Sequence, residues 1–330
     1  MRVALNALIM AVLAVCLSSC GGGGQPKSET TETIQLACIP KSTGGEFWET
    51  VEAGARRAAG ELNVEIKWEG TVTETEIAEQ NKIIENMINL GVDGIALAPL
   101  NRRAQKKLAE SAVEAGIPVV IFDSGLDGDA HTSFVATDNK EGGVKGARHM
   151  IDLLGGAGRV MVMRYVQGTG STEARAEGFI ATATAAGLEV VADPYPETGT
   201  VEGSKNVAVN TLEGFVKEGR LDLDGLFACN LYSTLGVVSA LDDLRKSGIE
   251  VDLKFIGFDT SKKLIEELMA GGIQALVAQN PDKMGYLAVR TIYQVVKGQP
   301  VPKVIDTGVE LITADRVNGE PAIRKLVGLE

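Results

Sequence analysis

Residues 115–123 read Ala-Gly-Ile-Pro-Val-Val-Ile-Phe-Asp and contain the unit that decides the fold: a helix end, a glycine, a buried strand and a polar residue. Glycine permits the left-handed backbone that ends a helix, and a short apolar run beside Gly and Pro is typical of a buried strand. The same connection recurs at 186–190 (AGLEV) and 247–251 (SGIEV). The recurrence predicts two similar α/β halves.

Outward from this unit, short apolar runs alternate with longer segments of helical period. This pattern predicts an α/β fold with two doubly wound parallel-sheet domains. Strands are predicted over 34–39, 64–68, 94–98, 118–122, 133–136, 159–163, 189–192, 225–228, 253–258, 274–278 and 304–307. A helix is predicted over 76–89, behind the capping-box sequence TETE at 73–76 and ahead of Gly91.

Size and charge narrow the class of protein. The chain has 330 residues, more than one hydrophobic core usually fills, so two domains are expected. Its formal net charge of −12, with no basic block, argues against nucleic acid and against an anionic membrane surface as partners.

The first twenty residues predict export. Arg2 is the only charge, Ala4 to Leu17 is almost wholly apolar, and Leu-Ser-Ser-Cys closes the run at Cys20. The run is shorter than the ~20 residues of a membrane span, so residues 1–19 are predicted to be a signal peptide. The closing motif resembles the lipobox of bacterial lipoproteins, which implies lipidation of Cys20 and a membrane anchor facing the periplasm or cell exterior. An ordinary signal peptide is the alternative. The polar residues 20–33 are expected to form a flexible tether.

Other cysteines and histidines give no metal or cofactor site. Cys38 and Cys229 lie inside strand-like runs and are interpreted as buried hydrophobes, and His131 and His149 are far apart without cysteine neighbours. Gly168-Thr169-Gly170 lacks the third glycine of a dinucleotide fingerprint. We therefore expect no metal and no cofactor, and no catalytic triad or carboxylate pair appears by spacing.

Four predicted strands end in a hydrogen-bonding side chain: Asp123, Asn230, Asp259 and Gln279. Ligands of parallel sheets bind beyond the carboxyl ends of the strands. Carboxylates and carboxamides can pair with vicinal hydroxyls as acceptors or donors. The four residues therefore predict a site for a small polar solute, although each alone could equally begin a loop or cap a helix.

Three further side chains are candidates. Phe47 and Trp48 follow the first strand, and we interpret them as lying at the opening turn of a helix instead of on its core face, where aromatic rings could stack on a sugar; packing under the loop is the alternative. Arg175, on a predicted helix, could fork two hydrogen bonds to ring oxygens or make a surface salt bridge.

These residues lie in a longer resemblance. From about Ile34 to Asp315 the chain resembles the ribose-type periplasmic sugar-binding proteins, the type I solute-binding proteins of ABC importers. The matching stretches are Phe47-Trp48 with Ala53-Gly54-Ala55, 92–95, 116–120 with Asp123, 136–139 with Gly142-Gly143, 175–179, 257–259, and 279–281 with Met284-Gly285.

The resemblance implies two α/β domains joined by a hinge of three segments, near 137–138, 279–280 and 308–309. The N-terminal domain would comprise 34–137 plus 280–308, and the C-terminal domain 138–279 plus 309–330. The implied ligand contacts are Phe47, Trp48, Asp123, Arg175, Asn230, Asp259 and Gln279.

Departures from the ribose pattern point to a different solute. Gly44-Gly45-Glu46 replaces the expected Asn, Ser124 stands where an Arg is expected, and Thr198, with Tyr195 nearby, stands where an aromatic is expected. Replacement contacts are expected from Lys41, Ser42, Glu46 and Ser124.

We expect a monomeric binding protein, not an enzyme, that closes over a monosaccharide or related polyol and passes it to the membrane permease of an ABC importer. The alternative is a sugar-sensing receptor for a signalling or chemotaxis partner without transport. A transcription regulator of the same fold would need a basic helix-turn-helix ahead of residue 34. An enzyme would need a perturbed acid and base, for which Asp123 and Asp259 are the candidates.

Overall fold

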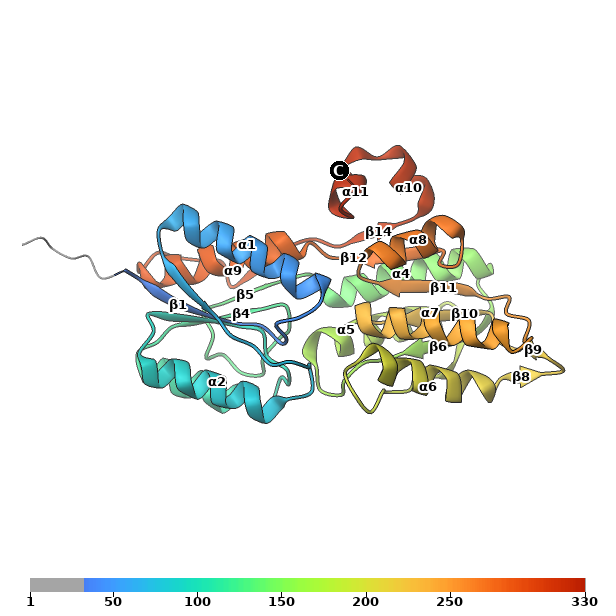
Figure 1. The fold of residues 1–330 in the computed structure, drawn as a ribbon, viewed down its shortest axis with the longest axis horizontal. Helices are drawn as coiled ribbons and strands as arrows, with labels where there is room; N and C mark the ends of the chain where they lie inside the picture. The colour runs from blue at the N-terminus through green and yellow to red at the C-terminus, as the bar shows by residue number, and fades with distance from the viewer. Residues whose placement is uncertain (1–32, 330) are drawn as a thin grey trace, which may run out of the picture. The chain divides into compact units, whose positions relative to one another are not determined.

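A computed structural model describes residues 33–329 of the chain. The signal peptide, Cys20 and almost all of the tether lie outside these residues, so the predictions made for them stay predictions. Residues 33–329 form an α/β structure with two six-stranded sheets, as the sequence predicts (Figure 1).

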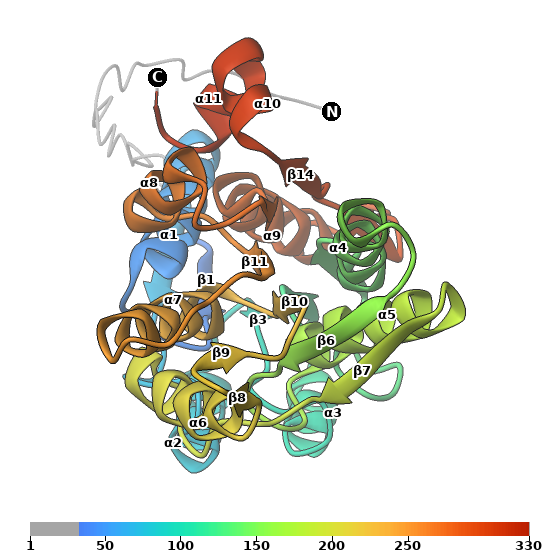
Figure 2. The same ribbon diagram turned by 90° about the vertical axis from the view of Figure 1, so that its right-hand side faces the viewer.

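The first sheet has the order β13-β5-β4-β3-β1-β2, with all neighbours parallel. Its strands are β1 (Gln35–Ile39), β2 (Glu65–Trp68), β3 (Gly94–Leu97), β4 (Val119–Phe122), β5 (Ser133–Ala136) and β13 (Val304–Asp306). Helices α1 (Glu46–Leu62) and α9 (Pro281–Val296) cover one face, and α2 (Ile77–Leu90) and α3 (Lys106–Glu114) cover the other (Figures 1 and 2). We call this sheet with its helices the first lobe.

The second sheet has the order β14-β12-β11-β10-β6-β7, with only β14 antiparallel to its neighbour. Its strands are β6 (Gly158–Met163), β7 (Leu188–Ala192), β10 (Gly225–Ala228), β11 (Lys254–Phe258), β12 (Ala275–Ala278) and β14 (Glu310–Ile312). Its helices are α4 (Asn139–Leu154), α5 (Gly170–Ala185), α6 (Val201–Glu213), α7 (Leu231–Lys246) and α8 (Lys262–Ala270). This second lobe also holds the hairpin β8 (Val216–Lys217) and β9 (Arg220–Leu221), and the short helices α10 (Ala314–Gly319) and α11 (Pro321–Leu326).

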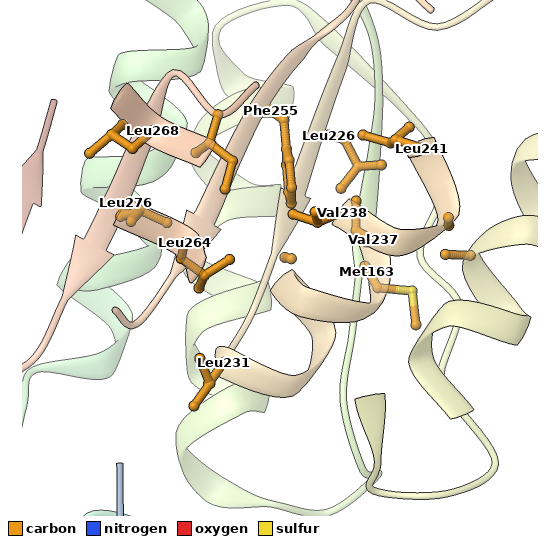
Figure 3. Packing of buried hydrophobic residues seen from close by; sticks show 14 of the residues in the cluster. Met163, Leu226, Leu231, Val237, Val238, Leu241, Phe255, Leu264, Leu268 and Leu276 are labelled. Atoms are coloured by element: carbon orange, nitrogen blue, oxygen red, sulfur yellow. The ribbon is translucent and has the colours of Figure 1, made fainter. Parts of the chain in front are cut away.

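Both faces of each sheet are buried, because alternate residues of a strand point to opposite faces. In β6, Val160 and Val162 pack with α4 and α5, whereas Met161 and Met163 pack with α6, α7 and α8. Figure 3 shows the second of these cores, where leucines and valines of α7 and α8 lie over strand residues such as Phe255. Four such layers, two in each lobe, hold the sheets rigidly and fix where the strand ends lie.

Three stretches of chain pass from one sheet to the other. Residues 137–138 join β5 to α4, residues 279–280 join β12 to α9, and residues 307–309 join β13 to β14. Each lobe therefore contains a helix that follows a strand of the other lobe. The three crossings lie where the resemblance implied the segments of a hinge.

Several glycines in the sequence stretches that carry the resemblance lie where two helices pack closely against each other. A Cβ on Gly54 of α1 would lie 2.0 Å from the carbonyl oxygen of Asp282 in α9, and one on Gly285 would lie 1.9 Å from that of Val51. In the second lobe a Cβ on Gly143 of α4 would lie 2.0 Å from the carbonyl oxygen of Arg175 in α5. The same device thus packs one helix pair in each lobe, and in α5 it fixes the backbone that carries Arg175.

The predicted strands agree with the structure to within about a residue at each end. Sequence reasoning missed β14 and the β8–β9 hairpin, whose strands are only two or three residues long. The predicted capping box forms by half only: Glu76 Oε2 accepts hydrogen bonds from the amides of Thr73 (2.8 Å) and Val72 (2.9 Å), but the helix begins later, at Ile77. Within residues 33–329, none of the helices is long and apolar enough to cross a membrane.

Candidate functional site

A small cavity lies where the carboxyl ends of the two sheets face each other. Its volume is about 20 Å³, room for about one water molecule. It is lined by Lys41, Phe47, Trp48, Glu74 and Asp123 of the first lobe, and by Ser171, Thr172, Arg175, Asn230, Leu231, Tyr232, Asp259 and Gln279, which follow strands of the second. All seven ligand contacts implied by the resemblance therefore meet at this cavity, together with Lys41.

Asp123 and Asp259 occupy matching positions in the two lobes. Each follows the last residue of a buried parallel strand, and each has a left-handed backbone, with φ of 58° and 69°. Such a backbone is uncommon outside glycine, and aspartate is one of the residues that tolerate it. Asn63 and Glu218 share this backbone elsewhere in the fold, but of the four residues only Asp123 and Asp259 line the cavity.

Arg175 is the cationic centre of the second-lobe wall, and only 2% of its surface is exposed. Its Nε donates to Asn139 Oδ1 (2.8 Å), and its Nη1 donates to the carbonyl of Cys229 (3.0 Å). The guanidinium carbon lies 3.9 Å from the centroid of the Phe258 ring, and Nη1 lies 3.9 Å from Asp259 Oδ2. These contacts hold the guanidinium in place before any ligand arrives, and they rule out the surface salt bridge considered above.

Asp259 and its neighbours complete this wall. Its Oδ2 accepts from the amide of Leu231 (2.9 Å), and its Oδ1 accepts from Gln279 Nε2 (2.7 Å). Asn230 caps α7 through a capping box with Ser233. Burial raises the pKa of Asp259, while Arg175 and these hydrogen bonds act in the opposite direction. The capping role of Asn230 and its place in the cavity are both real, so the two interpretations of this residue are compatible.

The first-lobe wall is built around a buried ion pair. Lys41 Nζ lies 2.6 Å from Asp123 Oδ2, and both side chains are 3% exposed. A carboxylate oxygen has two lone pairs, so Oδ2 can accept a further hydrogen bond beside Lys41. Lys41 Nζ also donates to Ser171 Oγ of the second lobe (3.1 Å). A lysine two residues beyond the end of β1 thus provides the cation beside Asp123 where Ser124 replaces the expected arginine.

The two aromatic residues differ in burial: Trp48 belongs to the hydrophobic core, and Phe47 is half-buried at the cavity wall. Trp48 is 2% exposed and belongs to the core between α1, α9 and the first sheet, with its ring edge-on to Phe122. The interpretation that it lies off the core face is therefore wrong, because the opening turn of α1 already faces the sheet. Its indole Nε1 donates to Glu74 Oε1 (2.7 Å). Phe47, half-buried, contacts the hydrophobic cores of both lobes and stands edge-on to Trp48 at 5.1 Å.

Two buried acceptors of the cavity can still accept a hydrogen bond: Gln279 Oε1 has no donor, and Asp123 Oδ2 contacts the Lys41 ammonium but keeps a second lone pair. Buried polar atoms in folded proteins are almost always paired. An acceptor left without a donor inside a cavity therefore points to hydroxyl groups supplied by a ligand. One acceptor comes from each lobe, which suits a ligand held between them.

The lobes also bond directly to each other beside the cavity. Ser124 Oγ donates to Ser171 Oγ (2.8 Å), Thr169 Oγ1 donates to the carbonyl of Leu100 (3.1 Å), and the Arg102 amide donates to the carbonyl of Gly168 (3.1 Å). Residues 168–171, which lead into α5 of the second lobe, thus rest on the first lobe. The structure is a closed arrangement, and a ligand larger than a water molecule can enter only if the lobes separate.

Three of the additional predicted contacts do not line the cavity. Ser42 Oγ donates to the carbonyls of Gly44 and Val72 (3.3 Å each), and Ser124 bonds to Ser171. Glu46 borders a neighbouring groove of about 1140 Å³, which α8 and the C-terminal helices also line. That groove adjoins the small cavity, since Phe47, Asp259 and Gln279 line both, but Asp123, Arg175 and Asn230 line the small cavity and not the groove.

Sequence reasoning missed Glu74, Ser171, Thr172, Leu231 and Tyr232. Tyr232 and Leu231 directly follow Asn230, and Ser171 and Thr172 open α5 one turn ahead of Arg175, so their proximity to predicted residues was a usable signal. No local sequence signal pointed to Glu74, because it lies in a loop whose path depends on tertiary contacts. Tyr195, near the expected aromatic position, instead donates to Glu173 Oε2 (2.9 Å).

The two described cysteines do not line the cavity. Cys38 and Cys229 are free and buried, and burial raises the pKa of each thiol to about 12. In the described part of the chain, no three His, Cys, Asp or Glu side chains gather as a metal ion would require. The cavity offers hydrogen bonds, two ion pairs and aromatic surface.

Two lobes joined by three crossings, with strand-end polar groups meeting in a closed cavity, define a two-domain solute-binding protein. A model of the periplasmic binding protein domain matches residues 36–300. The chain belongs to this family.

Known relatives cover nearly the whole chain. The D-ribose/D-allose-binding protein of Pseudomonas aeruginosa is 29% identical over 325 residues, 95% of this chain and 99% of that protein. A carbohydrate transporter solute-binding protein from Agrobacterium radiobacter, solved with D-arabinose, is 31% identical with a TM-score of 0.83 over 90% of this chain and 100% of that one. An ABC transporter solute-binding protein from Agrobacterium vitis, solved with D-fucose, is 34% identical with a TM-score of 0.82 over 89% and 99%.

Proposed function

We propose that this protein captures a monosaccharide or a related polyol between its two lobes and delivers it to the membrane permease of an ABC importer, without catalysis. The observation that carries the proposal is that two buried acceptors on opposite walls of one cavity can each still accept a hydrogen bond: Gln279 Oε1, which has no donor, and Asp123 Oδ2, which contacts Lys41 through one of its two lone pairs. Vicinal hydroxyls are the ligand groups that satisfy both acceptors without adding charge.

The relatives support this assignment. They are named for binding ribose or allose, or were solved with arabinose or fucose. This chain has the strand-end residues that the resemblance implies, but it has Lys41 beside Asp123 and Ser124 where an arginine is expected, so we propose a solute other than ribose. The proposed contacts are Lys41, Phe47, Trp48, Asp123, Arg175, Asn230, Asp259 and Gln279.

The remaining assignments extend this proposal. We place the boundary between the two domains at the three crossings, so that 34–137 plus 280–308 and 138–279 plus 309–330 move as bodies. The protein acts as a monomer, exported by its N-terminal signal and anchored through an acylated Cys20. These points rest on the sequence and on the topology of the sheets.

A thermal-shift screen tests the ligand class. The panel contains D-arabinose, D-fucose, D-ribose, D-allose, xylitol, nucleosides and phosphorylated sugars. A ligand at about 100 times its Kd stabilises the folded protein by roughly 2.7 kcal/mol. We expect a clear rise in Tm with at least one uncharged sugar or polyol, and a panel without any such rise contradicts the proposal.

A further inference from the structure

Glu74 is a buried carboxyl group on the wall of the cavity, and neither the sequence pattern nor the family resemblance gave it a role. It lies between β2 and α2 and is 7% exposed. Its loop is tied down locally, because Thr71 Oγ1 donates to the carbonyls of Lys41 (2.5 Å) and Thr73 (2.8 Å). The carboxyl is therefore held at the cavity by the fold of the first lobe.

Glu74 is poorly supplied with partners for a charged group. Its Oε1 accepts from Trp48 Nε1 (2.7 Å). An ionised carboxylate has about four lone-pair sites, and a buried one needs a cation or several donors. Asp259, by contrast, accepts from an amide and from Gln279 and lies beside Arg175.

The cations of the cavity are already engaged by other carboxylates. Lys41 lies 2.6 Å from Asp123, and Arg175 lies 3.9 Å from Asp259. The five charged groups lining the cavity therefore comprise two ion pairs and Glu74. An ionised Glu74 would leave one buried negative charge without a cation of its own, which is strongly unfavourable.

The surroundings of Glu74 favour its neutral form in the closed structure. Burial raises the pKa of Glu74, Lys41 and the Trp48 hydrogen bond lower it, and the charges of Asp123 and Asp259 raise it further. The phenols of Tyr165 and Tyr232, which interact with it electrostatically, are neutral, since burial raises the pKa of Tyr165 well above its ordinary value and that of Tyr232 to about 12.

We propose that Glu74 is a specificity-determining residue, a neutral carboxyl that makes the closed cavity electroneutral, so that the protein selects uncharged sugars over both sugar acids and amino sugars. This inference rests on the proposed function and names the class of its substrate. A sugar acid would place a fourth carboxylate among three carboxyl groups. An amino sugar would place a cation in the cavity, where the ionised carboxylates of Asp123 and Asp259 already pair with Lys41 and Arg175.

Closure then couples sugar binding to a proton. When the lobes separate, water reaches Glu74 and an ionised carboxylate is favoured above its ordinary pKa of about 4.3. Closure raises that pKa, so binding takes up a proton in the pH range between the open-form and closed-form pKa values. In that range the association constant falls as pH rises, by at most tenfold per pH unit.

The experiment uses the mature chain and whichever of D-arabinose, D-fucose, D-ribose and D-allose binds the wild type most tightly by isothermal titration calorimetry. The variants are Glu74→Gln, which keeps shape and neutrality, and Glu74→Ala, with Glu79→Gln on the exposed side of α2 as the matched control. We expect Glu74→Gln and Glu79→Gln to bind within threefold of wild type, and Glu74→Ala to bind at least tenfold more weakly with an unchanged Tm before sugar is added.

Two further readouts separate a neutral Glu74 from a merely structural one. In buffers of different ionisation enthalpy, wild type should take up more protons on binding than Glu74→Gln does, at pH values just above the ordinary glutamate pKa of about 4.3; the uptake that remains in Glu74→Gln comes from Asp259, whose pKa burial also raises. D-galacturonate, D-glucuronate, D-galactosamine and D-glucosamine should bind at least 100-fold more weakly than the uncharged sugar.

The proposal is overturned if Glu74→Gln binds as weakly as Glu74→Ala and wild type takes up no more protons than Glu74→Gln does, or if an amino sugar binds more tightly than the uncharged sugar. Should Glu74→Ala fold poorly, a smaller proton uptake in Glu74→Gln than in wild type supports the proposal, and an equal uptake overturns it. If no sugar binds wild type at all, it is the proposed function that fails.

Discussion

The two walls of the cavity differ in how they are held. On the second-lobe wall, Arg175 is fixed by Asn139, Cys229 and the Phe258 ring, and Asp259 by an amide and Gln279, all within that lobe or its hinge. On the first-lobe wall, Lys41 has one partner in its own lobe, Asp123, and another across the cavity, Ser171. One wall is preorganised, and the other is completed by closure.

The difference between the walls indicates the order in which they contact the sugar. A wall whose side chains are already ordered loses little entropy when a ligand arrives, which improves affinity. The second lobe is therefore the expected first docking surface for the sugar. The first lobe follows, and its lysine and the loop contacts at 168–171 contribute only once the lobes have come together.

Arg175→Ala should break the preorganised wall and have the largest effect. Removing one partner of a buried charge network leaves Asp259 uncompensated and costs about 3–5 kcal/mol of folding stability. Sugar affinity should fall by roughly 100-fold or more. Denaturant unfolding and calorimetry measure the two losses, with the exposed Arg148→Ala as control, for which a change within ~1 kcal/mol is expected. Wild-type affinity in Arg175→Ala would contradict the assignment of the second-lobe wall.

Lys41→Met tests the wall that closure completes. In the open form Asp123 is hydrated and tolerates the loss of its partner, so the stability of the unliganded protein should change by less than about 1 kcal/mol. In the closed form Asp123 would be buried without a cation, and affinity should fall by roughly 30-fold, about 2 kcal/mol. A loss of stability as large as that of Arg175→Ala would show that the two walls do not differ as described.

Gly170→Ala tests closure alone. A Cβ at this position would lie 2.9 Å from the carbonyl oxygen of Gly125 in the opposite lobe. Overpacking of this kind costs about 1–3 kcal/mol, and here the cost applies only when the lobes meet. Sugar affinity should fall about tenfold, through a faster dissociation rate measured by stopped flow. Gly60→Ala in α1, where a Cβ meets nothing within 4 Å, should bind as wild type does.

The sequence predicted the fold and the strand-end half of the site because both depend on local pattern. Asp123, Asn230, Asp259 and Gln279 follow buried parallel strands, and the carboxyl ends of such strands meet at one edge of a sheet. The dual role of Trp48 was missed because an aromatic at the start of a helix can face the core and a cavity at once.

The rest of the site depends on tertiary contacts that no local pattern encodes. Glu74 reaches the cavity through a loop held by Thr71 and by Glu76, and Ser171 matters only because the second lobe meets Lys41 and Ser124 of the first. The capping sequence at 73–76 closes a loop, and the helix begins after it at Ile77. Tertiary packing, not the local sequence, decides between these two outcomes.

The most direct test of closure over a sugar is a distance measurement between spin labels on the two lobes, at Arg103→Cys and Glu197→Cys, both at exposed positions. Cys38 and Cys229 should remain unlabelled, because they are buried and their thiol pKa values are raised to about 12. Saturating sugar should shift the distance distribution to a single shorter population. A distribution that is unchanged while calorimetry shows the sugar bound would contradict capture by closure.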